Sequence, residues 1–279
     1  MRTPGRIALS TASLLLGALS FLGAPAPDVP VTPVGLDPTC AAQLATSLTR
    51  SDAHVLGCEP GERGRAVVSL GDPATARHVA VLVPGAGIDL HTLHDPANPR
   101  NRPFGWAEAL RDASPDTAVV LWVGYPTPEG VDLDAATGRL ARSGVPALVE
   151  EVTALHRANP AAGLTVIGHS YGTVVVALAA RALPADDIAL LASPGARADD
   201  VADLHTSARV WAARAADDWI RLMPHVRLGD LGHGGDPAAP DFGARLLPTD
   251  GVHGHDGYLV PGSPTLTALA TVLTTPRAA

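Results

Sequence analysis

Lysine is absent from the sequence, and all 20 of its basic residues are arginines. A genomic preference for arginine codons would be a sufficient explanation, but the absence still restricts the chemistry. Schiff-base catalysis, pyridoxal phosphate anchoring, Ser-Lys dyads and the lysine-bearing phosphate loop are excluded. Acidic residues outnumber basic ones, which gives a net charge of −8. Because phosphate binding needs a basic stripe, we expect no nucleic-acid partner.

Cysteine is scarce, and Cys40 and Cys58 are the only two. In an oxidising compartment two lone cysteines usually form a disulfide. Closing this loop would stabilise the fold by about 3 kcal/mol on the chain-entropy estimate. Two unrelated buried thiols are the alternative.

Long apolar runs are missing except at the N-terminus, which resembles an export signal. Arg2 and Arg6 precede an apolar stretch from Ile7 to Leu22, and small residues follow as far as Ala26. Residues 1–26 are therefore interpreted as a signal peptide or an N-terminal anchor. The protein is expected to be secreted or in the cell envelope, with membrane contact only through an uncleaved N-terminal segment.

The rest of the chain divides at about residue 60. Residues 27–60 form a Pro-rich extended segment, expected to be mobile up to Pro38, and a short Cys-bearing region with a helical pattern over Cys40–Thr49. Residues 61–279 show no repeat and no further linker, which indicates one domain.

Short apolar strands alternate with helical patterns throughout this domain. Strands are predicted over Ala66–Leu70, His78–Val83, Thr117–Val123, Leu164–Ile167, Ile188–Leu191 and Ala208–Ala212. Helices are predicted over Trp106–Asp112, Val145–Asn159, Thr173–Leu183, Asp199–Leu204 and Pro264–Leu273. This order indicates an α/β fold, a mostly parallel doubly wound sheet with helices on both faces. Functional residues are then expected at the carboxyl ends of the strands.

The segment Gly168-His169-Ser170-Tyr171-Gly172 lies between a predicted strand and a predicted helix. This is the G-x-S-x-G nucleophile elbow in its strand–turn–helix setting. Ser170 must sit in a strained turn, so the positions two before and two after it need glycine. The pattern predicts Ser170 as the nucleophile of a serine hydrolase with the α/β-hydrolase fold.

An oxyanion hole requires two preorganised N–H groups. One is expected from Tyr171, directly after the nucleophile. The other is expected from Ala86, in the Gly-rich turn that follows the strand ending at Val83, because glycines let the backbone approach a substrate. An ordinary strand-end turn is the alternative for that loop.

The acid and the base should follow the nucleophile in chain order. Asp217 and Asp218 both follow the strand that ends at Ala212, and alternation of side chains in extended backbone lets only one of them face the histidine. Later histidines are His225, His233, His253 and His255. The position just before the last helix favours His255 as the base, with His253 as the alternative.

No metal or cofactor is expected. A zinc site built from His253, His255 and Asp256, or from His91 and His94, is conceivable, but no ligand spacing demands it. The loop after Asp218 has too little apolar character to predict a lipase lid.

Several motifs resemble an α/β-hydrolase family of high-GC bacteria that is known mostly as a domain of unknown function. The resemblance extends from about Cys58 to Thr271 and rests on Gly71–Pro73, Val81–Gly85, Leu121–Pro126, Val166–Gly172, Ser193–Gly195, Asp241–Arg245 and Gly254–His255. The family pattern of Asp, any residue and Ile implies Asp218 as the acid, and the same pattern implies His255 as the base. Members often carry a long helical region before this domain, which is reduced here to the short Cys-bearing segment.

Together these residues predict a secreted serine hydrolase that cleaves a small-molecule or lipid-like ester, or an amide, through an acyl-enzyme. One alternative is an acyltransferase that delivers the acyl group to a cell-envelope alcohol with the same triad. Another is a non-catalytic envelope binding protein on a hydrolase fold, which would be expected to have a broken triad. Substrate, acyl length and oligomeric state are not predicted.

Overall fold

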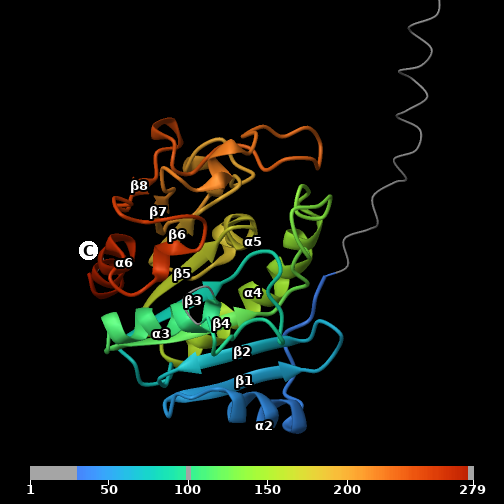
Figure 1. Ribbon diagram of the computed structural model, residues 1–279. Coiled ribbons are helices and arrows are strands. Elements are labelled where there is room, and N and C mark those ends of the chain that lie inside the picture. The colour runs from blue at the N-terminus through green and yellow to red at the C-terminus, as the bar shows by residue number, and fades with distance from the viewer. Residues whose placement is uncertain (1–29, 99–101, 276–279) are drawn as a thin grey trace, which may run out of the picture.

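A sheet of eight strands organises the computed structural model, which describes residues 30–98 and 102–275 (Figure 1). The predicted signal peptide or anchor, residues 1–26, lies outside these residues. The strands are β1 (Ala53–Glu59), β2 (Arg65–Leu70), β3 (His78–Val83), β4 (Thr117–Val123), β5 (Gly163–His169), β6 (Asp187–Leu191), β7 (Arg209–Ala213) and β8 (Arg245–Leu246). Their order is β1-β2-β4-β3-β5-β6-β7-β8. Strand β2 is antiparallel to both neighbours, and all pairs from β4 to β8 are parallel.

Helices cover both faces of this sheet. They are α2 (Pro38–Ser47), α3 (Pro103–Ala113), α4 (Arg139–Ala158), α5 (Gly172–Ala179) and α6 (Pro264–Thr274). Residues of α2, α3 and α6 share one hydrophobic core with the sheet, and residues of α4 and α5 share a second core on the opposite face. In Figure 1, α3 and α6 accordingly lie on the other side of the strands from α4.

Strand β4 shows why the buried strands are apolar at almost every position. All its residues are buried. Leu121 and Val123 enter the core shared with α3 and α6, whereas Val120 and Trp122 enter the core shared with α4 and α5. A parallel sheet covered on both faces needs apolar side chains at every position, since alternate residues point to opposite faces.

The N-terminal part of the described chain is fastened to the sheet. Cys40 of α2 and Cys58 of β1 form a disulfide with a Cα–Cα distance of 5.7 Å. Ahead of it, the Cys58 amide donates to the Gly35 carbonyl at 2.8 Å, and the Val31 amide donates to Ser143 of α4 at 2.8 Å. Residues 31–36 form no helix, and these bonds tie them to β1 and α4.

The structure differs from the prediction at β1. Residues 53–59 pair antiparallel with β2, so the sheet begins ahead of residue 61. The strand was missed because His54 and Gly57 interrupt its apolar pattern, and the pairing shifts register between Val55 and Gly57. The edge strand is held by backbone bonds, which a hydropathy pattern does not register.

The helix predicted over Asp199–Leu204 is also wrong. Only a single 3-10 turn forms, over Ala202–Leu204. The Asp203 side chain accepts from the Asp199 amide, and the Asp200 side chain accepts from the Asp203 amide. Aspartates that bind nearby amides in this way compete with helical hydrogen bonds.

Across the described residues, no helix is both long enough and apolar enough to cross a membrane.

Candidate active site

Ser170 occupies a tight turn between β5 and α5, at the carboxyl end of a central strand. Its φ angle is 54°, in the left-handed region that residues other than glycine seldom adopt. The turn is held because the Ser170 amide donates to the Leu191 carbonyl at 2.9 Å, and the Thr173 hydroxyl donates to the Ser170 carbonyl at 2.6 Å. These hydrogen bonds therefore hold the strained conformation of Ser170 and fix its hydroxyl at the carboxyl end of β5.

Glycine is required on both sides of this turn. A Cβ atom at Gly168 would lie 2.7 Å from the Thr173 Cα atom, and one at Gly172 would lie 2.6 Å from the Pro84 carbonyl oxygen. Both distances are too short for a real side chain. The spacing seen in the sequence thus has the steric origin proposed for it.

Three of the predicted residues form a continuous hydrogen-bond relay. His255 Nε2 lies 2.8 Å from Ser170 Oγ, and His255 Nδ1 lies 2.8 Å from Asp218 Oδ1. Since the carboxylate can only accept, Nδ1 carries the proton, and Nε2 accepts from the serine hydroxyl. Asp218 is fully buried, whereas 15% of the His255 side chain is exposed.

The Asp218 carboxylate is satisfied on both oxygens. Besides His255, Oδ1 accepts from the Ile220 amide at 2.9 Å, and Oδ2 accepts from the Tyr258 hydroxyl at 2.6 Å. Burial raises the pKa of Asp218, but the hydrogen bonds from His255 and Tyr258 outweigh it and hold that pKa below its usual range. Asp218 is therefore a buried anion near neutral pH.

His169 supports the loop that carries His255. It is buried, and its Nε2–H donates to the His255 carbonyl at 2.8 Å. Its ring packs against Trp106 and His255, with centroids 4.7 Å and 5.0 Å away. Burial and the neighbouring His255 lower the pKa of His169 to about 3, so this imidazole is neutral.

The neighbouring pair, Asp217 and His253, lies on the solvent side of the same loop. His253 is 84% exposed at its side chain and donates to Asp217 at 3.2 Å. Asp217 also accepts from the Gly254 amide at 3.0 Å, and this bond lowers its pKa. The adjacent aspartates thus bind the same loop at two points, and only Asp218 reaches His255.

The loop after β3 lies against the nucleophile turn. A Cβ atom at Gly85 would lie 2.7 Å from Ser170 Cβ and 2.9 Å from the Tyr171 amide nitrogen. The Tyr125 hydroxyl donates to the Pro84 carbonyl at 2.8 Å and fixes this approach. Within residues 30–98 and 102–275, neither the Ala86 amide nor the Tyr171 amide donates to a protein acceptor. Both N–H groups are available beside Ser170.

The conceivable zinc ligands do not come together. His255 uses both ring nitrogens in the relay, and His253 faces solvent. His91 Nε2 donates to the Gly61 carbonyl at 2.9 Å, and the His94 ring packs edge-on against Phe104. In the part of the chain that the structure describes, no group of three or more potential ligand side chains is placed to hold a metal ion.

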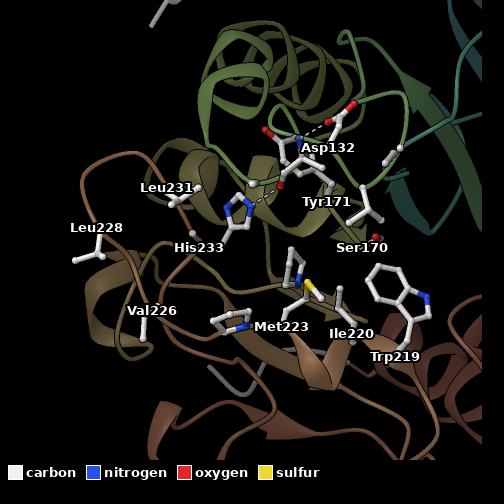
Figure 2. A pocket seen from close by; sticks show the side chains of 18 residues that line it. Asp132, Ser170, Tyr171, Trp219, Ile220, Met223, Val226, Leu228, Leu231 and His233 are labelled. Carbon is white, nitrogen blue, oxygen red and sulfur yellow. Dashed lines mark hydrogen bonds between the residues drawn. The ribbon is translucent and has the colours of Figure 1, made fainter. Parts of the chain in front are cut away.

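A cavity of about 300 Å³ opens beside Ser170 (Figure 2). Two segments form its walls, residues 130–136 after β4 and residues 219–233 after Asp218, named here the 130–136 wall and the 219–233 wall. Its apolar lining residues include Val131, Pro194, Trp219, Ile220, Met223, Val226, Leu228 and Leu231. The loop after Asp218 thus contributes apolar side chains to the cavity, although its sequence has too little apolar character to predict a lipase lid.

The comparisons with known proteins identify the family. A family model described as alpha/beta hydrolase matches residues 59–228, more than half of the chain, so the protein belongs to this family. The uncharacterized proteins Rv2079 and MT2140 of two Mycobacterium tuberculosis strains are each 35% identical over 244 residues. The match covers 76% of this chain, and the chain spans only 37% of the length of these relatives. The predicted resemblance to a hydrolase family of high-GC bacteria is confirmed.

Two solved structures are similar to this chain over most of its length. A mutant of esterase rPPE in complex with (S)-Ac-CPA is similar over 95% of this chain and 97% of its own, with a TM-score of 0.50 and 14% identity. Dienelactone hydrolase from Anabaena variabilis is similar over 79% of this chain and 94% of its own, with a TM-score of 0.47 and 20% identity. With the family match, the α/β-hydrolase fold is confirmed.

Two residues of the site were not predicted. Tyr258 follows His255 by three positions, and this spacing assigns no partner to its hydroxyl, although a buried tyrosine usually has one. His169 occupies a variable position of the elbow, to which the motif assigns no role. Both contacts depend on the final loop folding back over the sheet, which spacing in the sequence does not specify.

Proposed function

We propose that this protein is a serine hydrolase that cleaves carboxylic esters through an acyl-enzyme on Ser170. The observation that carries the proposal is the unbroken relay from buried Asp218 through His255 to Ser170, with both contacts of His255 at 2.8 Å. A serine hydroxyl is a weak nucleophile unless a base removes its proton, and this arrangement supplies the base and the group that orients it.

In the proposed first half-reaction, His255 Nε2 takes the Ser170 proton as Oγ bonds to the ester carbonyl carbon. The amides of Ala86 and Tyr171 stabilise the oxyanion, and Asp218 stabilises the imidazolium without taking its proton. The tetrahedral intermediate then collapses, the C–O bond to the alcohol breaks, and His255 protonates the leaving oxygen. Water repeats the sequence on the acyl-enzyme, releasing the acid and restoring Ser170.

We also propose that the protein acts outside the cytoplasm. The export-like pattern of residues 1–26 supports this, and so does the disulfide between Cys40 and Cys58, because disulfides persist mainly in oxidising compartments.

Labelling with a fluorophosphonate, which modifies activated serines, tests the function. We expect the folded protein to be labelled at Ser170 and to hydrolyse p-nitrophenyl acetate. Ser170→Ala should abolish labelling and reduce turnover on the order of a million-fold. Labelling that persists in a folded Ser170→Ala protein would refute the assignment, and no labelling of the parent protein would favour the non-catalytic envelope protein. Product analysis with an added alcohol acceptor separates hydrolysis from acyl transfer.

A further inference from the structure

The cavity beside Ser170 has two distinct ends. Figure 2 shows Ser170 and Trp219 at one end, with Val226, Leu228 and Leu231 at the far end. Ser170, Ala86 and Tyr171 all contribute to its lining, so the cavity begins where the two available amides lie. A group attached to a carbonyl carbon on Ser170 can therefore extend from the oxyanion site into this space.

The position of His255 decides which half of an ester enters the cavity. His255 is not among the described residues that line it, and Trp219 packs at a tilt against the His255 ring with centroids 4.6 Å apart. The leaving alcohol must receive its proton from His255 Nε2, so it departs on the histidine side of Ser170. The half that stays bound to Ser170, the acyl group, then lies on the cavity side.

The two walls hold each other in place. The Gly232 amide donates to the Ala136 carbonyl at 2.8 Å, and the His233 ring contacts the Ala135 carbonyl at 2.8 Å. Asp230, at the tip of the 219–233 wall, accepts from Arg197 at 2.8 Å and from Arg142 of α4 at 2.5 Å. The cavity is thus preformed, and little ordering is needed when a ligand enters.

Apolar surface is concentrated at the far end of the cavity. Leu228 is 76% exposed, Val226 60% and Leu231 53%, and these three residues are named here the rim. The nearby Asp230 is neutralised by its two arginines, and Asp132 accepts from the Ala135 amide at 2.9 Å. A clustered apolar rim around a pocket marks a binding site for an apolar group, because leaving it in water is unfavourable.

We infer that the acyl group of the substrate is an aliphatic chain of medium length that lies in this cavity and emerges over the rim. This inference rests on the proposed function and specifies its substrate. The volume of about 300 Å³ is at the small end of the range for ligand pockets, and at about 30 Å³ for a methylene-sized group it admits a chain of up to roughly ten carbons.

The test compares two matched ester series with the full chain. One series varies the acyl chain of p-nitrophenyl esters from acetate through butyrate and octanoate to palmitate, and the other varies the alcohol of alkyl acetates from ethyl to octyl. We expect kcat/KM for octanoate to exceed that for acetate by at least about tenfold, since each buried methylene can favour binding by up to about fourfold. The alkyl acetates should show no comparable rise.

Substitutions at the rim make the test specific. In a Val226→Ser, Leu231→Ser double variant, the octanoate-to-acetate ratio of kcat/KM should fall at least about fivefold, because the far end of the chain loses apolar contacts. Leu222→Ser is the matched control, since Leu222 lies in the same segment, is 70% exposed and does not line the cavity. Its ratio should equal that of the parent protein.

The outcomes separate the two proposals. A rise with alcohol length instead of acyl length, or acetate hydrolysis with no dependence on either length, would overturn the acyl-chain inference and leave the hydrolase assignment intact. No hydrolysis of any ester, together with no fluorophosphonate labelling, would overturn the hydrolase assignment itself.

Discussion

The Tyr258 hydroxyl donates to Oδ2 of Asp218 at 2.6 Å, the oxygen that His255 does not contact. The same hydroxyl accepts from the Ala215 amide at 2.8 Å. Tyr258 is therefore fixed by the end of one strand while it holds the carboxylate that orients the histidine. Because Tyr258 and His255 belong to one loop, that loop contacts Asp218 on both of its oxygens.

Replacing Tyr258 by Phe should consequently reduce kcat about tenfold or more and leave KM nearly unchanged. The substitution leaves Oδ2 of a buried anion without a donor, which costs about 1.5–3 kcal/mol, and the imidazolium that Asp218 supports forms only in the transition state. Steady-state kinetics on a short-chain ester measure the effect. A raised KM with unchanged kcat would show that Tyr258 serves substrate binding instead.

The paired aspartates and histidines give a direct test of the triad. Asp218→Asn and His255→Ala should lose nearly all esterase activity, equivalent to several kcal/mol of transition-state stabilisation. Asp217→Asn and His253→Ala should keep most of it, since both side chains lie toward solvent and an asparagine oxygen can still accept from Gly254. A reversed ranking in either pair would reassign that member of the triad.

Gly85→Ala should reduce kcat by roughly 100-fold or more, the usual effect of losing an oxyanion donor. Its new methyl would lie 2.7 Å from Ser170 Cβ and would push the Pro84–Ala86 loop away from the nucleophile. Gly61→Ala is the matched control, because a Cβ atom there meets its nearest neighbour at an ordinary 3.6 Å. Equal rates for the two variants would argue against an oxyanion hole in this loop.

His169 should make the protein less stable in mild acid. Its pKa is lowered from 6.5 to about 3 in the folded state, mainly by burial. As pH falls below the unfolded value, the unfolded chain takes up a proton that the folded protein does not, so the folded state loses stability. Between about pH 7 and about pH 5 the loss amounts to about 2 kcal/mol. Urea unfolding at the two pH values should show this loss in the parent protein.

The non-titrating variant His169→Gln serves as the reference for that measurement. Its amide can still donate to the His255 carbonyl, but it takes up no proton in this range. The drop in unfolding free energy from neutral to acid pH should therefore be about 2 kcal/mol smaller than in the parent protein. An equal drop in both proteins would assign the acid sensitivity to other groups.

Reduction of the disulfide should destabilise the protein by about 3 kcal/mol, because opening the loop between Cys40 and Cys58 restores chain entropy to the unfolded state. Denaturant unfolding with and without reductant measures this difference. Peptide mapping of protein from an exported fraction, without reductant, should recover the two cysteines as one linked peptide. Two free thiols in such material would contradict the pairing and remove the support that the disulfide gives to the proposed export.

Much of the fold could be predicted because buried strands have a distinct composition. β3 and β4 were predicted with the bounds they have in the structure, since runs such as Ala118–Val123 are apolar at every position. β1 was missed because the backbone and the disulfide, more than its side chains, attach it to the sheet. The Asp199–Leu204 segment was predicted as a helix, because its aspartate side-chain bonds are not visible in a hydropathy pattern.

The site could be predicted only where local backbone geometry dictates the residues. Ser170 is flanked by glycines because a Cβ atom would collide there, and that requirement is visible in five residues of sequence. The cavity depends on contacts between segments distant in the chain, such as Gly232 with Ala136, which are 96 residues apart. No local sequence pattern indicates that contact, so the apolar walls of the cavity could not be predicted from the sequence.

The long chain separations within the relay have a consequence for how the proposed activity arises. His255 is 85 residues from Ser170 and 37 residues from Asp218, and the His169 bond that supports it spans 86 residues. No contiguous short fragment holds the three groups, so a nascent or partly folded chain has a serine without its base. Such a hydroxyl is a poor nucleophile. The proposed activity therefore arises only when folding is complete, and turnover should appear when the last loop closes over the sheet.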